Sequence, residues 1–182
     1  MLSKRHSVII VVLKIQSIQT VDFQVTVQVD PYVPLEVRTY SKPLGAVFYR
    51  VGNFKTSLVE LPIDPTSNMI RGFDLVRIDR VKPFIDDQCW PTKVGLPVVN
   101  LETVPRHGLL DEVRDISVSL VENRFVIDWS NGCEIEFKTS YGRLTFFIGR
   151  DMLLGAAVEN LKAFEAEQLG ERLRSPRLIT QH

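Results

Sequence analysis

Apolar and polar residues alternate with a period of two along most of the chain, and this pattern predicts β-strands. Between residues 23 and 29, Phe and Val alternate with Gln and Thr, which is typical of a strand with one buried and one solvated face. Residues 35–40 and 46–51 predict two further strands. Another pair is predicted within residues 57–79, joined by a turn at residues 64–68, where Asp, Pro, Ser and Asn favour turn conformations.

A second group of alternating segments, residues 116–148, predicts a meander of hairpins. The register follows from aligning the apolar faces, because a shift of one residue would turn every side chain to the opposite face. A three-residue loop at residues 130–132 satisfies this condition and places Asp128 directly opposite Glu134. The same reasoning predicts a two-residue turn and a four-residue loop at the other connections, residues 122–123 and 139–142.

The two ends of the chain differ from this pattern. Residues 8–13 are the longest apolar run, and we interpret them as a buried first strand, because a membrane-spanning helix needs roughly 20 residues. Residues 153–158 fit either a last strand or the first turns of a helix. Asn160 is the predicted N-cap of a helix that runs to about Arg174. The pattern therefore predicts an α+β fold of mostly antiparallel β-sheet with one C-terminal helix.

Composition favours one globular domain over residues 1–182. The chain has 182 residues, of which 45% are hydrophobic, and this is the size of a single domain. Its 22 basic and 22 acidic residues cancel, which excludes global disorder and a globally basic nucleic-acid binder. The two cysteines, Cys89 and Cys133, are far apart in sequence, which indicates reduced thiols in a cytoplasmic protein.

The sequence contains no phosphate-binding loop, zinc-protease motif or serine-hydrolase motif. We therefore predict no catalytic residue, metal site or cofactor. The irregular residues 82–107 leave one alternative open, an enzyme or a small-ligand-binding domain with its site in this region. Its candidate side chains are Asp86, Asp87, Cys89, Trp90 and His107.

Charge is segregated along the chain despite the neutral total. Residues 111–136 carry seven acidic residues against Arg114 and Arg124. The predicted register opposes like charges across the sheet, which costs a few tenths of a kcal/mol of stability. One interpretation is an acidic face that receives a basic partner, and the other is a solvated face on which salt screens the repulsion. The candidate partner-binding residues are Asp111, Glu112, Asp115, Asp128, Glu134 and Glu136.

Two stretches of the chain resemble bacterial immunity proteins, which neutralise polymorphic and contact-dependent growth inhibition toxins. The first combines Ser-Leu-Val-Glu-Leu-Pro-Ile-Asp-Pro-Thr at residues 57–66 with Ile-Arg-Gly-Phe-Asp-Leu-Val at residues 70–76. The second is residues 146–161, where a last strand leads into a short C-terminal segment. The resemblance implies a non-enzymatic cytoplasmic inhibitor that binds one cognate toxin domain, and it identifies no binding residues.

The leading hypothesis from the sequence is therefore an immunity protein whose acidic face binds its toxin directly. A nuclease toxin would suit such a face, because carboxylates can imitate the phosphate charges that a basic cleft recognises. We expect no direct contact with nucleic acid or membrane. A homodimer stays open as an alternative.

Overall fold

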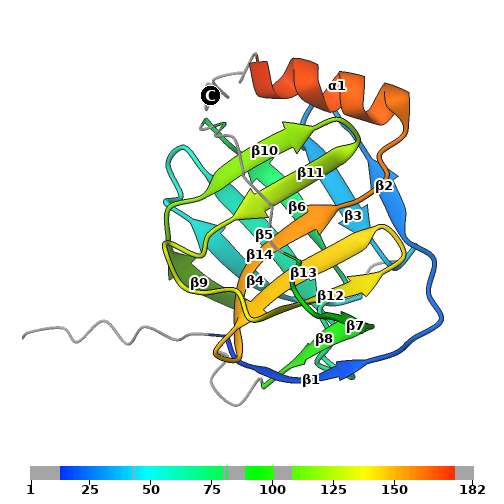
Figure 1. Cartoon of the computed structure of the whole chain (residues 1–182), viewed down its shortest axis with the longest axis vertical. Helices are drawn as coiled ribbons and strands as arrows, with labels where there is room; N and C mark the ends of the chain where they lie inside the picture. The colour runs from blue at the N-terminus through cyan, green and yellow to red at the C-terminus, as the bar shows by residue number, and fades with distance from the viewer. Residues whose placement is uncertain (1–12, 43, 80, 82–88, 101–107, 175–182) are drawn as a thin grey trace, which may run out of the picture.

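The computed structural model describes residues 13–42, 44–79, 81, 89–100 and 108–174 (Figure 1). These residues form two six-stranded sheets, one two-stranded ribbon and one C-terminal helix, α1 (Ala163–Arg174). The predicted α+β class, mostly antiparallel sheet with one C-terminal helix, is confirmed. Most of the predicted first strand, residues 8–13, lies outside the described residues.

The N-terminal sheet has the strand order β2-β3-β6-β5-β4-β9. All its neighbours are antiparallel except β4 and β9, which are parallel. The predicted strands of residues 35–40 and 46–51 correspond to β3 and β4, and the predicted pair within 57–79 corresponds to β5 and β6. The strands of this sheet are β2 (Thr26–Gln28), β3 (Leu35–Arg38), β4 (Val47–Gly52), β5 (Leu58–Ile63), β6 (Gly72–Arg77) and β9 (Leu109–Val113).

The C-terminal sheet has the strand order β10-β11-β14-β13-β12-β7. Again all neighbours are antiparallel except the pair β12 and β7. Residues 153–158, which fitted either a strand or a helix, belong to the strand β14. The strands of this sheet are β7 (Thr92–Val94), β10 (Ser117–Val121), β11 (Arg124–Asp128), β12 (Phe137–Tyr141), β13 (Leu144–Gly149) and β14 (Met152–Val158).

The two sheets repeat one topology. In each, five consecutive strands take the order first, second, fifth, fourth, third, and a sixth strand lies parallel to the third. Both sixth strands, β7 and β9, come from the connection between β6 and β10. The registers also match, since Gly72 and Gly155 occupy equivalent positions. A Cβ atom at these glycines would lie 1.9 Å from the carbonyl oxygen of Val37 and 2.6 Å from that of Ile127, respectively.

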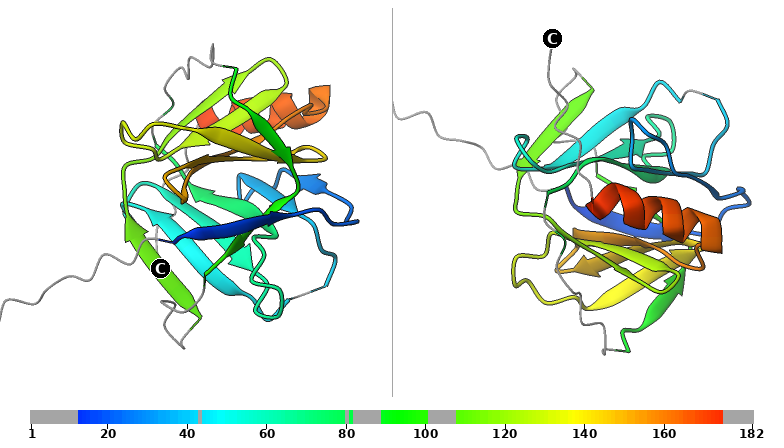
Figure 2. Two further views of the ribbon diagram at one scale, coloured as in Figure 1. Left: turned by 60° about the horizontal axis from the view of Figure 1, so that its bottom comes forward. Right: turned by 90° about the horizontal axis from the view of Figure 1, so that it is seen from above.

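The sheets form two layers (Figure 2), and their inner faces share one hydrophobic core cluster. Alternating positions of the strands supply it, as the period-two pattern predicts. Trp129 is fully buried and its indole Nε1 donates a hydrogen bond of 2.8 Å to the carbonyl oxygen of Leu153. The other large side chains that are fully buried include Tyr49, Phe73, Phe125, Phe146 and Phe147.

Additional elements lie at both ends of the layers (Figure 1). At one end, β1 (Ile15–Gln19) pairs antiparallel with β8 (Leu96–Val99), and the pair adds the buried side chains of Ile15, Leu96 and Val99 to the core. At the other end lies α1, near the edge strands β2 and β10. The helix begins later than predicted, because Asn160 has a left-handed φ of 54°. Instead, the Glu165 carboxylate accepts a hydrogen bond of 2.7 Å from the backbone N–H of Lys162, as in a capping box.

The predicted hairpin across residues 130–132 is wrong. The turn itself forms, with a hydrogen bond of 3.0 Å from the Cys133 N–H to the Ser130 carbonyl oxygen. However, β11 has β14 as its second neighbour, and residues 133–136 belong to no strand. The reason is that Leu153 to Val158 of β14 are buried on both faces, which requires an interior position with a neighbour on each side.

The other two predicted connections have opposite outcomes. Val121 pairs with Arg124, so the two-residue turn at 122–123 is confirmed. Tyr141 pairs with Leu144, so the four-residue loop at 139–142 is wrong and the turn has two residues. Gly142 allows this tighter turn because it adopts a left-handed φ of 58°.

Candidate binding cleft

The structure separates the acidic residues that the sequence predicted to share one face. Asp111 and Glu112 belong to β9 in the N-terminal sheet, where they point to opposite faces. Glu112 is only 4% exposed, and its carboxylate accepts hydrogen bonds from the Tyr49 hydroxyl and the Arg114 guanidinium. Glu112 is therefore an interior residue of the fold and not part of an exposed acidic face.

Asp128, Glu134 and Glu136 are also apart. Asp128 lies opposite Gly155 of β14, and its carboxylate accepts a hydrogen bond of 2.9 Å from the Ser130 N–H. Glu134 and Glu136 are exposed and precede β12, which is three strands away from β11 in the sheet. At ~4.8 Å per strand, three strands correspond to about 14 Å. The predicted opposition of Asp128 and Glu134 is therefore wrong, and exposed Asp115 does not complete a cluster with them.

A line of polar residues, all charged except the first, crosses the N-terminal sheet from β2 to β9. At each step along it, the two residues are register partners on neighbouring strands. Their chain neighbours on β3, β4, β5 and β6 include the fully buried core residues, so the line lies on the outer face. We call it the transverse row, and in spatial order it consists of Gln28, Glu36, Asp74, Glu60, Arg50 and Asp111.

Two arginines neutralise part of the transverse row. Arg38 donates to both carboxylate oxygens of Asp74, from Nε at 3.3 Å and from Nη2 at 3.0 Å. The same Nη2 lies 3.1 Å from Oε1 of Glu36. Arg50 forms the matching pair with Asp111, from Nε at 2.6 Å and from Nη2 at 2.7 Å. Two-point pairing of this kind is the strong form of an arginine–carboxylate interaction.

Glu60 stands between these two pairs without an ion pair of its own. It lies opposite Asp74 on one side and Arg50 on the other. Within the part of the chain that the structure describes, its carboxylate makes no hydrogen bond or salt bridge. Burial raises the pKa of Glu60 above its ordinary value; Arg50 lowers this pKa, and Asp74 and Asp111 raise it further.

Glu36 and Asp74, the next two carboxylates along the row, have pKa values shifted in the same direction. Burial raises the pKa of Asp74 and of Glu36, and the guanidinium of Arg38 lowers both without cancelling the effect of burial. Asp74 is only 7% exposed. Three adjacent carboxylates therefore lie where water stabilises their charge poorly, which favours a cation beside them.

A cleft of about 720 Å³ lies over this part of the row. Its charged side chains come from the sheet except for Lys42, which belongs to the connection after β3; residues 40–42 and 44–46 of this connection contribute much of the remaining lining. The rings of Tyr40 and Phe48 and the side chain of Val76 give it apolar surface. Among the lining residues that the structure describes, the acidic ones are Glu36, Glu60 and Asp74, and the basic ones are Arg38 and Lys42.

The C-terminal sheet shows that this topology does not require a charged row. When the two sheets are aligned by strand order and register, the position of Glu36 is taken by Val126, that of Asp74 by Ala157 and that of Glu60 by Thr145. Val126 and Ala157 belong to a small apolar cluster on which Trp90 and Ile135 pack. The remaining equivalents of the row, Ser119, Ser140 and Val94, are uncharged. The carboxylates are therefore a property of the N-terminal sheet alone and not of the shared strand arrangement.

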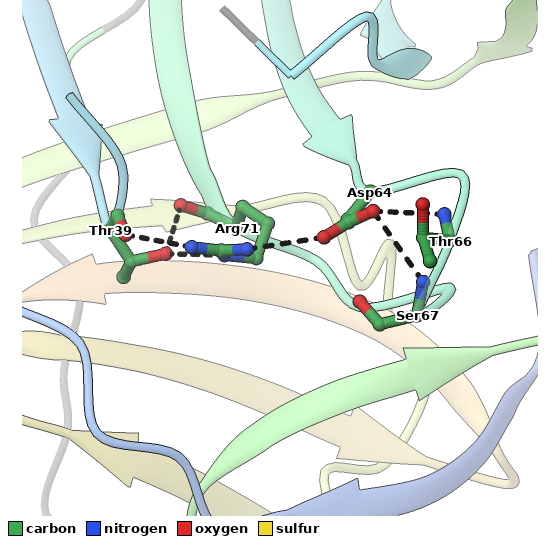
Figure 3. A network of polar contacts seen from close by, with 5 residues as sticks. All are labelled: Thr39, Asp64, Thr66, Ser67 and Arg71. Atoms are coloured by element: carbon green, nitrogen blue, oxygen red, sulfur yellow. Dashed lines mark hydrogen bonds and ion pairs between the residues drawn. The ribbon is translucent and has the colours of Figure 1, made fainter. Parts of the chain in front are cut away.

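Arg71, directly before β6, stabilises the fold (Figure 3). Its side chain donates to the hydroxyl and carbonyl oxygens of Thr39, both at 2.8 Å, and to Oδ2 of Asp64 at 3.2 Å. The other oxygen of Asp64 accepts hydrogen bonds from the N–H groups of Thr66 and Ser67. The buried guanidinium thus connects the predicted turn at 64–68, which is confirmed, to the end of β3.

Of the five candidate side chains for the alternative site in residues 82–107, the structure describes only Cys89 and Trp90. Trp90 packs edge-on against Phe147, with 5.6 Å between ring centroids, and is part of an apolar cluster. Cys89 is exposed. Asp86, Asp87 and His107 lie outside the described residues. No group of three or more metal-ligating side chains is present in the described ranges.

Comparison with known family models and with curated proteins gave no match for this chain. The described part of the chain also contains no helix with the length and apolar character needed to cross a bilayer.

The sequence contained one signal for the transverse row. Glu36, Glu60 and Asp74 each occupy a polar position in a predicted strand, between residues that alternate toward the core. A charge count along the chain could not find them, because they come from three separate segments. Only the spatial strand order makes them neighbours.

Proposed function

We propose that this protein is a non-enzymatic binding protein that receives a basic segment of a protein partner in the cleft on its N-terminal sheet. The observation that supports this most strongly is the row of three adjacent carboxylates, Glu36, Asp74 and Glu60. Like charges directly opposite each other destabilise a sheet. The equivalent positions of the C-terminal sheet carry Val, Ala and Thr, so the same topology folds without this cost.

An immunity protein is the class of binding protein that we propose. Such a protein acts by covering its partner's functional surface, and a carboxylate cleft complements a basic surface in charge. Nuclease toxins present basic surfaces because they bind phosphates. The resemblance of residues 57–66 and 70–76 to immunity proteins supports the same class, and these segments include Glu60 and Asp74. The cytoplasm is the expected compartment for such an inhibitor.

A growth-protection assay tests this proposal. The chain is co-expressed with a candidate toxin domain, chosen from the genes next to its own, and the affinity of the purified pair is measured by calorimetry. The test variant combines Glu36→Gln with Glu60→Gln. The matched control combines Glu134→Gln with Glu136→Gln, which removes the same charge from exposed positions outside the cleft.

We expect the test variant to lose protection and at least tenfold in affinity, because a desolvated charge contact is worth about 1.5–3 kcal/mol. The control variant should protect as the wild type does. Full protection by the test variant would overturn the cleft as the binding surface. Loss of protection in the control alone would favour the acidic residues that the sequence first suggested.

A further inference from the structure

The charges around the cleft leave one carboxylate without a cation. The lining contains three carboxylates against two basic side chains, Arg38 and Lys42. The adjacent pair of Arg50 and Asp111 is neutral as a unit. Glu60 is the member of the row that has no salt bridge within the described residues. One added positive charge beside Glu60 would therefore neutralise this part of the sheet.

The resident arginines show which cation the row accommodates. Arg38 and Arg50 each place Nε and Nη2 against the two oxygens of an aspartate on a neighbouring strand. This two-point pairing of an arginine with a carboxylate therefore occurs on both sides of Glu60. Glu60 itself, between the two pairs, has no arginine paired with it in this way. A planar guanidinium matches a carboxylate at two points, whereas an ammonium group acts as a point charge.

The aromatic surroundings favour the same group. The guanidinium carbon of Arg38 lies 5.7 Å from the ring centroid of Tyr40, and that of Arg50 lies 5.5 Å from the ring centroid of Phe54. Phe48 also lines the cleft. It lies two residues before Arg50 on β4, so both side chains are on the same face of the sheet. Within the described ranges no cation lies over its ring.

We infer that the cleft binds a guanidinium group of the partner, an arginine side chain that pairs at two points with Glu60 and packs against Phe48. This inference rests on the proposed function and names the chemical group that the cleft selects. Glu60 supplies the charge and the two acceptors. Phe48 supplies a ring face of the kind on which guanidinium groups stack.

Labelled peptides test the choice of group. Three twelve-residue peptides of Gly and Ser carry four Arg, four Lys or four Glu residues, and fluorescence anisotropy measures their affinity for the full chain. N-acetylarginine amide, added as a competitor, tests whether a free small molecule suffices. The protein variants are Glu60→Gln and Phe48→Leu, with Glu134→Gln as the control of equal charge change.

We expect the wild type to bind the Arg peptide about tenfold more tightly than the Lys peptide, and not to bind the Glu peptide. Both cleft variants should lose this preference, and the control should keep it. Equal binding of the Arg and Lys peptides, weakened by Glu60→Gln, would overturn the guanidinium assignment while supporting a basic partner. Failure of both cationic peptides to bind would overturn the proposed function as well. Binding of N-acetylarginine amide as tight as the Arg peptide would keep the group but overturn the protein partner.

Discussion

Replacing Glu60 by Gln should make the protein more stable at neutral pH while it weakens partner binding. The neighbours on both sides of Glu60 are largely neutralised, Asp74 by Arg38 and Arg50 by Asp111. The repulsion and the attraction that they exert on Glu60 therefore nearly cancel. The main remaining penalty is the burial of the Glu60 charge, which is the largest cause of its raised pKa. A neutral amide of the same size avoids that penalty.

The expected gain is about 0.5–1 kcal/mol in the free energy of unfolding, a part of the roughly 1–3 kcal/mol that burying a polar group costs in proteins, because Glu60 is only partly buried. For a chain of this size it corresponds to a rise of about 1–4 °C in Tm. The gain should depend on pH in a specific direction. Because the folded protein raises the pKa of Glu60, the wild type has the full penalty above that raised value. Below the ordinary Glu pKa of about 4.3, Glu60 is protonated in both states and the penalty is absent.

Urea denaturation of the wild type and of Glu60→Gln, followed by circular dichroism at several pH values from 3 to 7, measures this difference. The exposed control Glu134→Gln should stay within about 0.3 kcal/mol of the wild type throughout. Two results would refute the reasoning. One is a Glu60→Gln protein that is less stable than the wild type at pH 7, and the other is a gain that is as large at pH 3 as at pH 7.

Three further changes have predicted outcomes in the same denaturation experiment. Gly72→Ala should cost at least about 3 kcal/mol, because its Cβ would meet a backbone carbonyl oxygen at 1.9 Å. The control Gly132→Ala has a left-handed φ but nothing within 4 Å of the added Cβ, and it should cost about 1 kcal/mol. Equal costs for the two variants would contradict the close approach at Gly72. Arg71→Gln should cost about 1–3 kcal/mol, because it removes the buried guanidinium that donates to Thr39 and to the partly exposed Asp64, and a loss below about 0.5 kcal/mol would argue against the network, on the scale of about 1 kcal/mol per hydrogen bond. Glu165→Gln should cost about 1–3 kcal/mol at pH 7 and nothing near pH 2, and Glu167→Gln should cost nothing at either pH.

The sign of the Glu165 prediction follows from its pKa. Burial raises the pKa of this carboxyl, but hydrogen bonds from Arg143 and from the Lys162 N–H, together with their charges, lower it below the ordinary value overall. The ionised form therefore stabilises the folded state above the ordinary Glu pKa of about 4.3, and this contribution is lost as the pH falls through the lowered pKa. A cost of Glu165→Gln that is as large near pH 2 as at pH 7 would contradict this assignment.

Local signals determined the elements of this fold. The turn at 64–68 forms because Asp64 bonds to the N–H groups that follow it, which is a property of that segment alone. The turn at 122–123 and the strands β3, β4 and β11 likewise follow from alternation and turn residues. Glu36, Glu60 and Asp74 lie at polar positions of their strands, but no local signal in the sequence marked them as neighbours.

The partner of each strand was decided only by tertiary structure. Backbone hydrogen bonds are the same for every sequence, so alternation specifies which face of a strand is buried but not which strand lies beside it. β14 is apolar on both faces and takes the interior position next to β11, which separates Asp128 from Glu134. In the other sheet, β6 lies between β3 and β5, which brings Glu36, Asp74 and Glu60 side by side. The sequence alone thus indicated an excess of acidic charge on a sheet, and the packing of buried strands decided where the carboxylates meet.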